Sequence, residues 1–160
     1  MVATIEVLTA DELFALAEEP CNSDLFGKDG ESRRIMYLYA DYAQKETHVT
    51  ALLDKRVVAI GALEQNPNNA SELWVKFIAV EESHQGEGLG GMIVERIFQY
   101  ALEHGKSLHP STFQPMGRER LLHKFRVFAA QHPQSICHCW HCQEQLGQCS
   151  TPASTPTAAK

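Results

Sequence analysis

The stretch His84-Gln85-Gly86-Glu87-Gly88-Leu89-Gly90-Gly91 joins an apolar run that ends at Val80 to an amphipathic run that begins at Leu89. An apolar run, then glycines, then a helical period together predict a strand, a tight loop and a helix. Glycines let the backbone approach a ligand closely, and a helix start offers unpaired N–H groups and the positive end of its dipole. The stretch therefore predicts a site for a phosphate or pyrophosphate group.

Two common nucleotide-binding motifs fit this stretch poorly. Three of its glycines satisfy the dinucleotide pattern G-x-G-x-x-G, but residues 81–85 separate the first of them from the strand. The acidic residue that should end a strand about 20 residues later is also missing. Gly105-Lys106-Ser107 resembles the end of a Walker A loop, yet Tyr100 occupies the position of its first glycine. Neither motif therefore explains the glycines.

The runs on both sides of the loop predict regular elements. Residues 72–80 (ELWVKFIAV) are apolar enough for a central strand. Two β-rich runs, residues 48–53 and 57–63, surround a polar turn and predict a hairpin. Residues 89–103 carry apolar side chains at the spacing of one helix face.

Shorter signals complete the α+β pattern. Residues 35–42 fit a helix or a strand equally well, because their periodicity does not separate the two. The other predicted elements are a strand at 4–8, a helix from Thr9 or Asp11 to Glu19, a loop at 20–34, a weak strand at 107–113 and a helix at 117–131. Three antiparallel strands, a helix, a strand and a helix are typical of an α+β fold.

The loop and the order of elements resemble the GNAT superfamily of N-acetyltransferases. The acetyl-CoA signature of that family is a strand followed by (Arg/Gln)-x-x-Gly-x-(Gly/Ala), which opens a helix. Here Ile78-Ala79-Val80 ends the strand, five residues follow, and Gln85-x-x-Gly88-x-Gly90 completes the signature. The elements from Thr47 to Gln131 also follow the order of that fold. The resemblance implies a mostly antiparallel sheet flanked by helices.

The resemblance also implies acetyl-CoA as co-substrate and indicates the residues that hold it. Backbone groups around Ile78 and Val80 are expected to pair with the pantetheine arm, as an added strand does. Glu87 brings a negative charge into the loop and Gln85 replaces the more usual arginine, so backbone dipoles must bind the pyrophosphate with Glu87 turned to solvent. The implied cofactor-binding residues are Ile78, Ala79, Val80, Gln85, Gly86, Glu87, Gly88, Leu89, Gly90 and Gly91.

The reaction of the family is the direct attack of a neutral primary amine on the thioester in a ternary complex. A lysine-like amine has a pKa near 10.4, so only about one molecule in 2,500 is neutral at pH 7 and a base is needed. Glu72 is the implied base, while Trp74 stands where one subgroup has its glutamate. No tyrosine follows Tyr100, and Leu121 stands where the family's helix tyrosine is expected. His123 is therefore the candidate that returns a proton to the CoA thiolate.

Charge and composition exclude some functions. The 160 residues suffice for one domain, and a net charge of −6 with a pI near 5.7 argues against a nucleic-acid binder. No apolar run is long enough to cross a membrane, and residues 1–6 lack the features of a signal peptide. We therefore expect a cytoplasmic protein that acts on a small-molecule or peptide amine, without a nucleic-acid or membrane partner.

The C-terminal segment differs in character from the rest of the chain. We predict a domain at residues 1–133, since Pro133 ends the last helix and nothing after it corresponds to the closing pair of strands of the family. Residues 134–160 are rich in Cys and His, then in Thr, Pro and Ala, which predicts disorder. Cys139-x-x-Cys142 has the spacing of zinc ligands, but a second such pair is missing, so no metal is expected.

Two other classes of function stay open at this point. The missing tyrosine and the missing strands favour a non-catalytic acyl-CoA-binding or interaction module. The cluster between Cys137 and Cys149 would suit a zinc-stabilised adaptor instead. Turnover of acetyl-CoA with amines separates the enzyme from the first alternative, and metal analysis tests the second.

Overall fold

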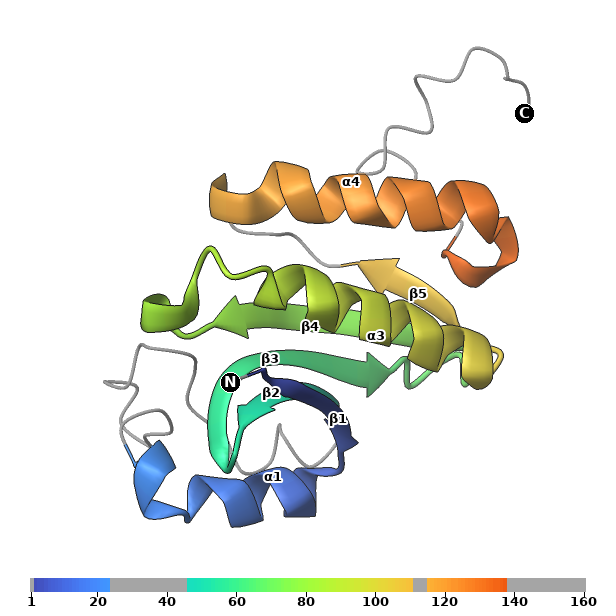
Figure 1. Cartoon of the computed structure of the whole chain (residues 1–160). Coiled ribbons are helices and arrows are strands. Elements are labelled where there is room, and N and C mark those ends of the chain that lie inside the picture. Colours follow the sequence, from blue (N-terminus) through green and yellow to red (C-terminus); the bar gives the residue numbers. More distant parts are fainter. Residues whose placement is uncertain (1, 24–45, 111–114, 138–160) are drawn as a thin grey trace, which may run out of the picture.

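The computed structural model of the chain describes residues 2–23, 46–110 and 115–137. These residues form one five-stranded sheet in the order β1-β2-β3-β4-β5 (Figure 1). Neighbouring strands are antiparallel except for β4 and β5, which run parallel. The strands are β1 (Thr4–Leu8), β2 (Glu46–Leu53), β3 (Arg56–Gln65), β4 (Glu72–Val80) and β5 (Ser107–Pro110). This mostly antiparallel sheet confirms the fold class predicted from the sequence.

The described residues also form three α-helices, which lie on both faces of the sheet. Helices α3 (Leu89–Glu103) and α4 (Pro115–Gln131) lie on one face, and α1 (Ala10–Ala17) packs against the other (Figure 1). None of these helices is both long enough and apolar enough to span a membrane. Short 3-10 turns occur at Pro20–Asn22, Glu82–His84 and Pro133–Ser135.

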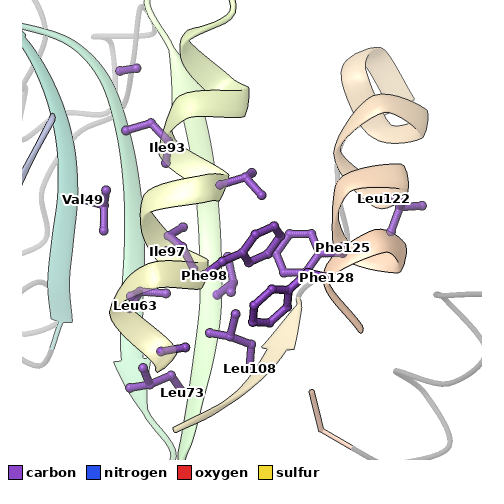
Figure 2. Close-up of a cluster of buried hydrophobic side chains, with 14 of the residues drawn as sticks. Val49, Leu63, Leu73, Ile93, Ile97, Phe98, Leu108, Leu122, Phe125 and Phe128 are labelled. Atoms are coloured by element: carbon purple, nitrogen blue, oxygen red, sulfur yellow. The ribbon is translucent and has the colours of Figure 1, made fainter. Parts of the chain in front are cut away.

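The larger core lies between the sheet and helices α3 and α4. Phe98 of α3 stacks on Phe128 of α4 with ring centroids 4.1 Å apart, and it meets Phe125 edge-on at 4.9 Å (Figure 2). Helix α3 lies close to β3 because Gly61 has no side chain. A Cβ at this position would lie 2.7 Å from Cγ2 of Ile93. This close approach fixes α3, and the loop before it, over the sheet.

Specific polar contacts hold α1 and the turn after it on the opposite face. The helix begins with a capping box, in which Thr9 and Glu12 each accept a hydrogen bond from the other's backbone N–H. The hydrogen bond from the backbone N–H of Thr9 is the main cause of the lowered pKa of Glu12, and the hydrogen bond with the Thr9 side chain is the second cause. After the helix, the buried side chain of Asn22 donates to the Lys55 carbonyl and accepts from the Val57 N–H. The turn is thereby tied to the β2–β3 hairpin.

The predicted elements agree well with the described ones. The predicted hairpin, central strand and following helix correspond to β2, β3, β4 and α3, and α4 begins two residues earlier than predicted. Strand β5 ends at Pro110, and the rest of the predicted strand at 111–113 lies outside the described residues. Of the loop predicted at 20–34, residues 24–34 lie outside them too, as does the ambiguous run at 35–42, and Pro20–Asn22 form a 3-10 turn.

Packing continues past residue 133, where the sequence predicts the end of the domain. Ile136 is only 2% exposed and belongs to the core beneath α3 and α4. Its neighbour Cys137 donates its backbone N–H to the Leu108 carbonyl of β5 at 2.7 Å, and Ile136 and Leu108 form an isolated parallel bridge. The segment after α4 therefore lies along the edge of β5 that faces away from β4.

We expect Ile136→Ala to lower the free energy of unfolding by about 2–5 kcal/mol, because it empties a buried position. Val127→Ala is the matched control, since this α4 side chain is 43% exposed. The control should change the free energy by less than about 0.5 kcal/mol. Denaturant unfolding of the full chain measures both variants. Equal, small losses would show that the packed domain ends at residue 133.

Candidate active site

Strand β4 has a hydrogen-bonding edge that β5 covers only in part. The two strands pair from Glu72 to Val75, while β4 continues to Val80 (Figure 1). Along its other edge β4 pairs with β3, with a bulge at Lys76. Within the described residues, no strand pairs beyond Val75 with the edge of β4 that faces β5. Among the described residues, the second half of β4 therefore has an edge without a strand partner, which begins at the bulge and is called the open edge below.

The backbone groups of Ile78 and Val80 point into this open edge. The Glu81 N–H donates to the Val58 carbonyl of β3 at 2.9 Å, and backbone groups alternate in direction along an antiparallel ladder. Ile78 and Val80 must therefore turn their N–H and C=O groups away from β3. The Gln85 side chain agrees with this direction, since its amide nitrogen donates to the Val80 carbonyl at 3.3 Å. The edge can pair with a ligand that lies beside it as an added strand.

The loop after β4 leads directly into the first turn of α3. Gly88 precedes the helix with a φ of 82°, and Gly86 has a φ of 88°, a region that side-chain-bearing residues rarely adopt. A Cβ at either position would meet no atom within 4 Å, so the backbone is open to a ligand on this side. The first N–H groups of a helix lack intrahelical partners and favour an anion. The loop therefore has the geometry of a phosphate site.

Ion pairs hold the loop in place without filling it. Glu81 is only 3% exposed and forms a salt bridge with Arg56, whose guanidinium also donates to the Cys21 carbonyl. The carboxylate of Glu87 lies 3.1 Å from Nδ1 of His84, and its side chain is 55% exposed. The Glu87 charge is thus partnered by an imidazole at the surface, which agrees with the outward orientation predicted from the sequence.

The structure also places a cation over the start of α3. The side chain of Lys124 in α4 crosses Gly91, where a Cβ would lie 2.9 Å from its Cε and 3.5 Å from its Nζ. The same Nζ pairs with Oε2 of Glu95 at 3.2 Å. Sequence reasoning missed this residue, because Lys124 lies on another helix and follows no pattern that connects it to the loop. Its ammonium group therefore lies beside the first turn of α3, where it is paired with Glu95.

The face of the sheet that points away from α3 and α4 carries a row of polar side chains. The row crosses four strands in register and consists of Glu46, Glu64, Trp74 and His109. Leu63 precedes Glu64 and Leu73 precedes Trp74, and both leucines belong to the core under α3. Because successive side chains of a strand point to opposite faces, the row lies on the other face of the sheet. Nζ of Lys76 lies 3.2 Å from Oε1 of Glu64 and 5.5 Å from the centroid of the Trp74 ring. The row therefore reaches the bulge where the open edge begins.

Next to this row, β2 buries polar atoms that lack hydrogen bonds. His48 and Thr50 are fully buried, and Oε2 of Glu46 lies 3.3 Å from Nε2 of His48. In the described part of the chain, both imidazole nitrogens, the Thr50 hydroxyl and the other Glu46 oxygen form no hydrogen bond. Such atoms are costly to bury without a partner. The strand-like pattern of β2 gave no indication of this cluster.

The structure does not bring the two predicted catalytic residues together. Glu72 begins β4, where its Oε1 accepts from Asn66 at 3.2 Å and its Oε2 lies 3.7 Å from Nδ1 of His109. It precedes the bulge at Lys76 by four residues, which is about 13 Å along a strand. His123 is exposed on α4, next in sequence to the lysine over the α3 start. The catalytic roles of Glu72 and His123 stay predictions.

Comparison with known proteins agrees with this geometry. Residues 11–113 match the model of the acetyltransferase (GNAT) family. The chain belongs to the GNAT family. It is accordingly an acyl-CoA-dependent N-acyltransferase, and the family predicted from the glycine signature is confirmed. A search among curated proteins gave no match.

Solved GNAT structures share the fold of this chain. One is a GNAT family acetyltransferase from Elizabethkingia anophelis with acetyl-CoA bound (21% identity, TM-score 0.53, 77% of this chain and 74% of that one). Another is an aminoglycoside acetyltransferase from an uncultured soil metagenomic sample (15% identity, TM-score 0.54, 87% of this chain and 95% of that one). A third is the ribosomal-protein-S18-alanine N-acetyltransferase from Escherichia coli (15% identity, TM-score 0.54, 77% of this chain and 76% of that one). At these identities the likeness establishes the fold alone.

We expect Gly88→Val to abolish binding of acetyl-CoA to this GNAT protein, because a β-branched side chain would strain the loop and fill its open space. Gly90→Ala is the matched control, since its Cβ would make an ordinary contact of 3.8 Å with Val80. At 100 times its dissociation constant, acetyl-CoA should stabilise the wild type and the control by about 2.7 kcal/mol in thermal melts. Full stabilisation of Gly88→Val would contradict the site, and stabilisation by NADH alone would favour a dinucleotide.

Proposed function

We propose that the protein transfers an acetyl group from acetyl-CoA to a primary amine by direct attack in a ternary complex. The observation that carries this proposal is the open edge of β4, which leads into the glycine loop at the start of α3. A ligand that combines an amide-containing arm with a pyrophosphate fits such an edge and loop. Acetyl-CoA has both parts, and it is the ligand bound in one structural neighbour.

In this proposal the backbone of β4 and the loop divide the binding of acetyl-CoA between them. Ile78 and Val80 pair with the pantetheine arm, and Ala79 between them supports the strand from the β3 side. The Gln85 side chain must leave the Val80 carbonyl when the arm arrives. Lys124 supplies a positive charge near the pyrophosphate. The loop residues of the proposed site are Gln85, Gly86, Glu87, Gly88, Leu89, Gly90 and Gly91.

The polar row supports an amine as the acceptor. It places the carboxylates of Glu46 and Glu64 on the face that points away from the α3 core, and Glu72 lies on the same face of β4. An amine is cationic at neutral pH and is attracted by carboxylates; the side chains of Glu64 and Glu72 are 15% and 12% exposed, whereas Glu46 is buried. Structural neighbours act on an aminoglycoside and on a ribosomal-protein alanine, so small-molecule and peptide amines both fall within the proposal. The cytoplasmic location predicted from the sequence belongs to the same proposal.

The proposed reaction needs a base and a polarised carbonyl. The amine nitrogen attacks the carbonyl carbon of the thioester, so that a C–N bond forms, the C–S bond breaks and CoA leaves as a thiolate. A backbone N–H of β4 stabilises the developing oxyanion. The amine loses one proton to a base, and His123 is the predicted donor of a proton to the thiolate.

Position favours Glu64 over Glu72 as the base. Glu64 lies directly opposite Trp74, and its carboxylate is 3.2 Å from Nζ of Lys76 at the bulge. Glu72 precedes the bulge by about 13 Å along the strand, two residues farther than Trp74, and it accepts a hydrogen bond from Asn66. We therefore assign proton removal to Glu64 and retain Glu72, which the sequence favours, as the second candidate.

We expect Glu64→Gln to lower turnover about 10²–10⁴-fold at pH values below the pKa of the amine, because only the general base is lost. The affinity for acetyl-CoA should not change. Glu72→Gln is the matched variant on the neighbouring strand and should retain turnover. Rate profiles against pH at saturating acetyl-CoA compare the two. A loss confined to Glu72→Gln would move the base to Glu72, and two unchanged profiles would exclude both carboxylates.

A non-catalytic acyl-CoA-binding module is the second candidate function. No tyrosine follows Tyr100 in the sequence, so the usual proton donor to the thiolate is absent from α4. In the described residues, the segment after α4 adds only the isolated bridge between Leu108 and Ile136 to the sheet. Such a module would bind acetyl-CoA without releasing its thiol.

Amine-dependent release of free CoA thiol separates the enzyme from the module. We expect at least one member of a panel of polyamines, aminoglycosides, lysine and peptides with free N-termini to accelerate thiol release from acetyl-CoA. Initial-rate lines that intersect would support the ternary complex, whereas parallel lines indicate a covalent intermediate and would contradict direct attack. Binding of acetyl-CoA without thiol release for any amine would favour the module.

A further inference from the structure

Three side chains with different metal-binding atoms meet at the end of β4 that lies opposite to the glycine loop. They are Glu72 of β4, His109 of β5 and Cys137 after α4, and their ligand atoms all lie within 4.8 Å of one another. Oε2 of Glu72 and Nδ1 of His109 are 3.7 Å apart. Their side chains are 12% and 26% exposed, so an ion can enter from solvent.

The fold fixes the backbone of Cys137 and of His109 and orients the side chain of Glu72. The backbone N–H of Cys137 donates to the Leu108 carbonyl at 2.7 Å, which fixes the segment after α4 against β5. His109 follows Leu108 in the same strand. Asn66 donates its side-chain amide to Oε1 of Glu72 at 3.2 Å, so that Oε2 is directed toward His109. Contacts of this kind orient metal ligands before the ion binds.

The set of donor atoms suits Zn²⁺. A thiolate, an imidazole and a carboxylate are its usual ligands, whereas a thiolate disfavours Mg²⁺ and Ca²⁺. Zinc–ligand bonds of about 2.0–2.3 Å in a tetrahedral site place the ligand atoms about 3.3–3.8 Å apart. The 3.7 Å separation lies in this range, and the others, which are at most 4.8 Å, need to close by at most about 1.5 Å. We propose that Glu72, His109 and Cys137 bind one Zn²⁺ ion.

The proposed ion joins β4, β5 and the segment after α4 at the edge of the sheet. Binding takes the proton from the Cys137 thiol and brings a positive charge beside the Glu72 carboxylate. Water completes the fourth position. The segment after α4 pairs with β5 through only one bridge in the described residues, so the ion adds a second tie at that edge. The effect proposed for the ion is on stability, and Glu64, to which proton removal is assigned, is not one of its ligands. The sequence predicted no metal, because only the fold brings these three residues together.

Metal analysis of the full chain, with its thiols kept reduced, tests the site. We expect about one Zn²⁺ per chain, and zinc at 100 times its dissociation constant should raise the Tm by about 5–10 °C. Cys137→Ser and His109→Gln should lose both effects. The matched controls Cys21→Ser and His104→Gln alter exposed residues and should keep both.

Zinc X-ray absorption of the wild-type complex gives a reading that does not depend on how the variants fold. One sulfur among the ligands supports the proposed site. Three or four sulfurs would overturn it, because they would place the ion on the other cysteines of the C-terminal segment. Absence of zinc binding by the wild type would also overturn the proposal. So would full zinc binding by both Cys137→Ser and His109→Gln.

Discussion

The structure depends on a strand that forms backbone hydrogen bonds with a neighbour along the whole of one edge but along only part of the other. Strand β4 pairs with β3 along one edge but with β5 only as far as Val75, where the partner residue is Pro110. Proline has no N–H, so it is suited to the end of a ladder. Among the described residues, no strand pairs with the backbone groups beyond this point, and an unpaired N–H or C=O is costly once it leaves water. A ligand that supplies a matching row of donors and acceptors satisfies this need.

Packing places the glycine loop at the end of that edge. The absence of a side chain at Gly61 lets α3 approach β3, and the Phe98 ring of α3 stacks on Phe128 of α4. The Arg56–Glu81 salt bridge ties the beginning of the loop to the start of β3. Apolar side chains fill the α3–α4 face of the sheet, and the polar row lies on the other face. In the proposed function, the cofactor binds at the open edge of β4 and the acceptor approaches from the face of the polar row, which ends next to that edge.

Local patterns predicted the parts of the protein that are local in the chain. The glycine loop, the strand before it and the helix after it follow from consecutive residues, and the family assignment drawn from them is confirmed. Contacts between distant segments gave no such signal. The position of Lys124 over the α3 start, the burial of Ile136 and the register that sets Glu64 opposite Trp74 all depend on tertiary packing. The sequence placed the candidate base on β4, since it could not show which carboxylate of the neighbouring strand lies closest to the open edge.

Amide hydrogen exchange along β4, measured with and without CoA, tests the central claim most directly. In the free protein, the amides of Ile78 and Val80 should exchange rapidly, because they face the open edge, while those of Phe77 and Ala79 are protected by β3. Saturating CoA should protect Ile78 and Val80 and leave the other two unchanged. Protection of Ile78 and Val80 already in the free protein would contradict an open edge. Rapid exchange of both amides in the complex would show that the cofactor does not bind along β4.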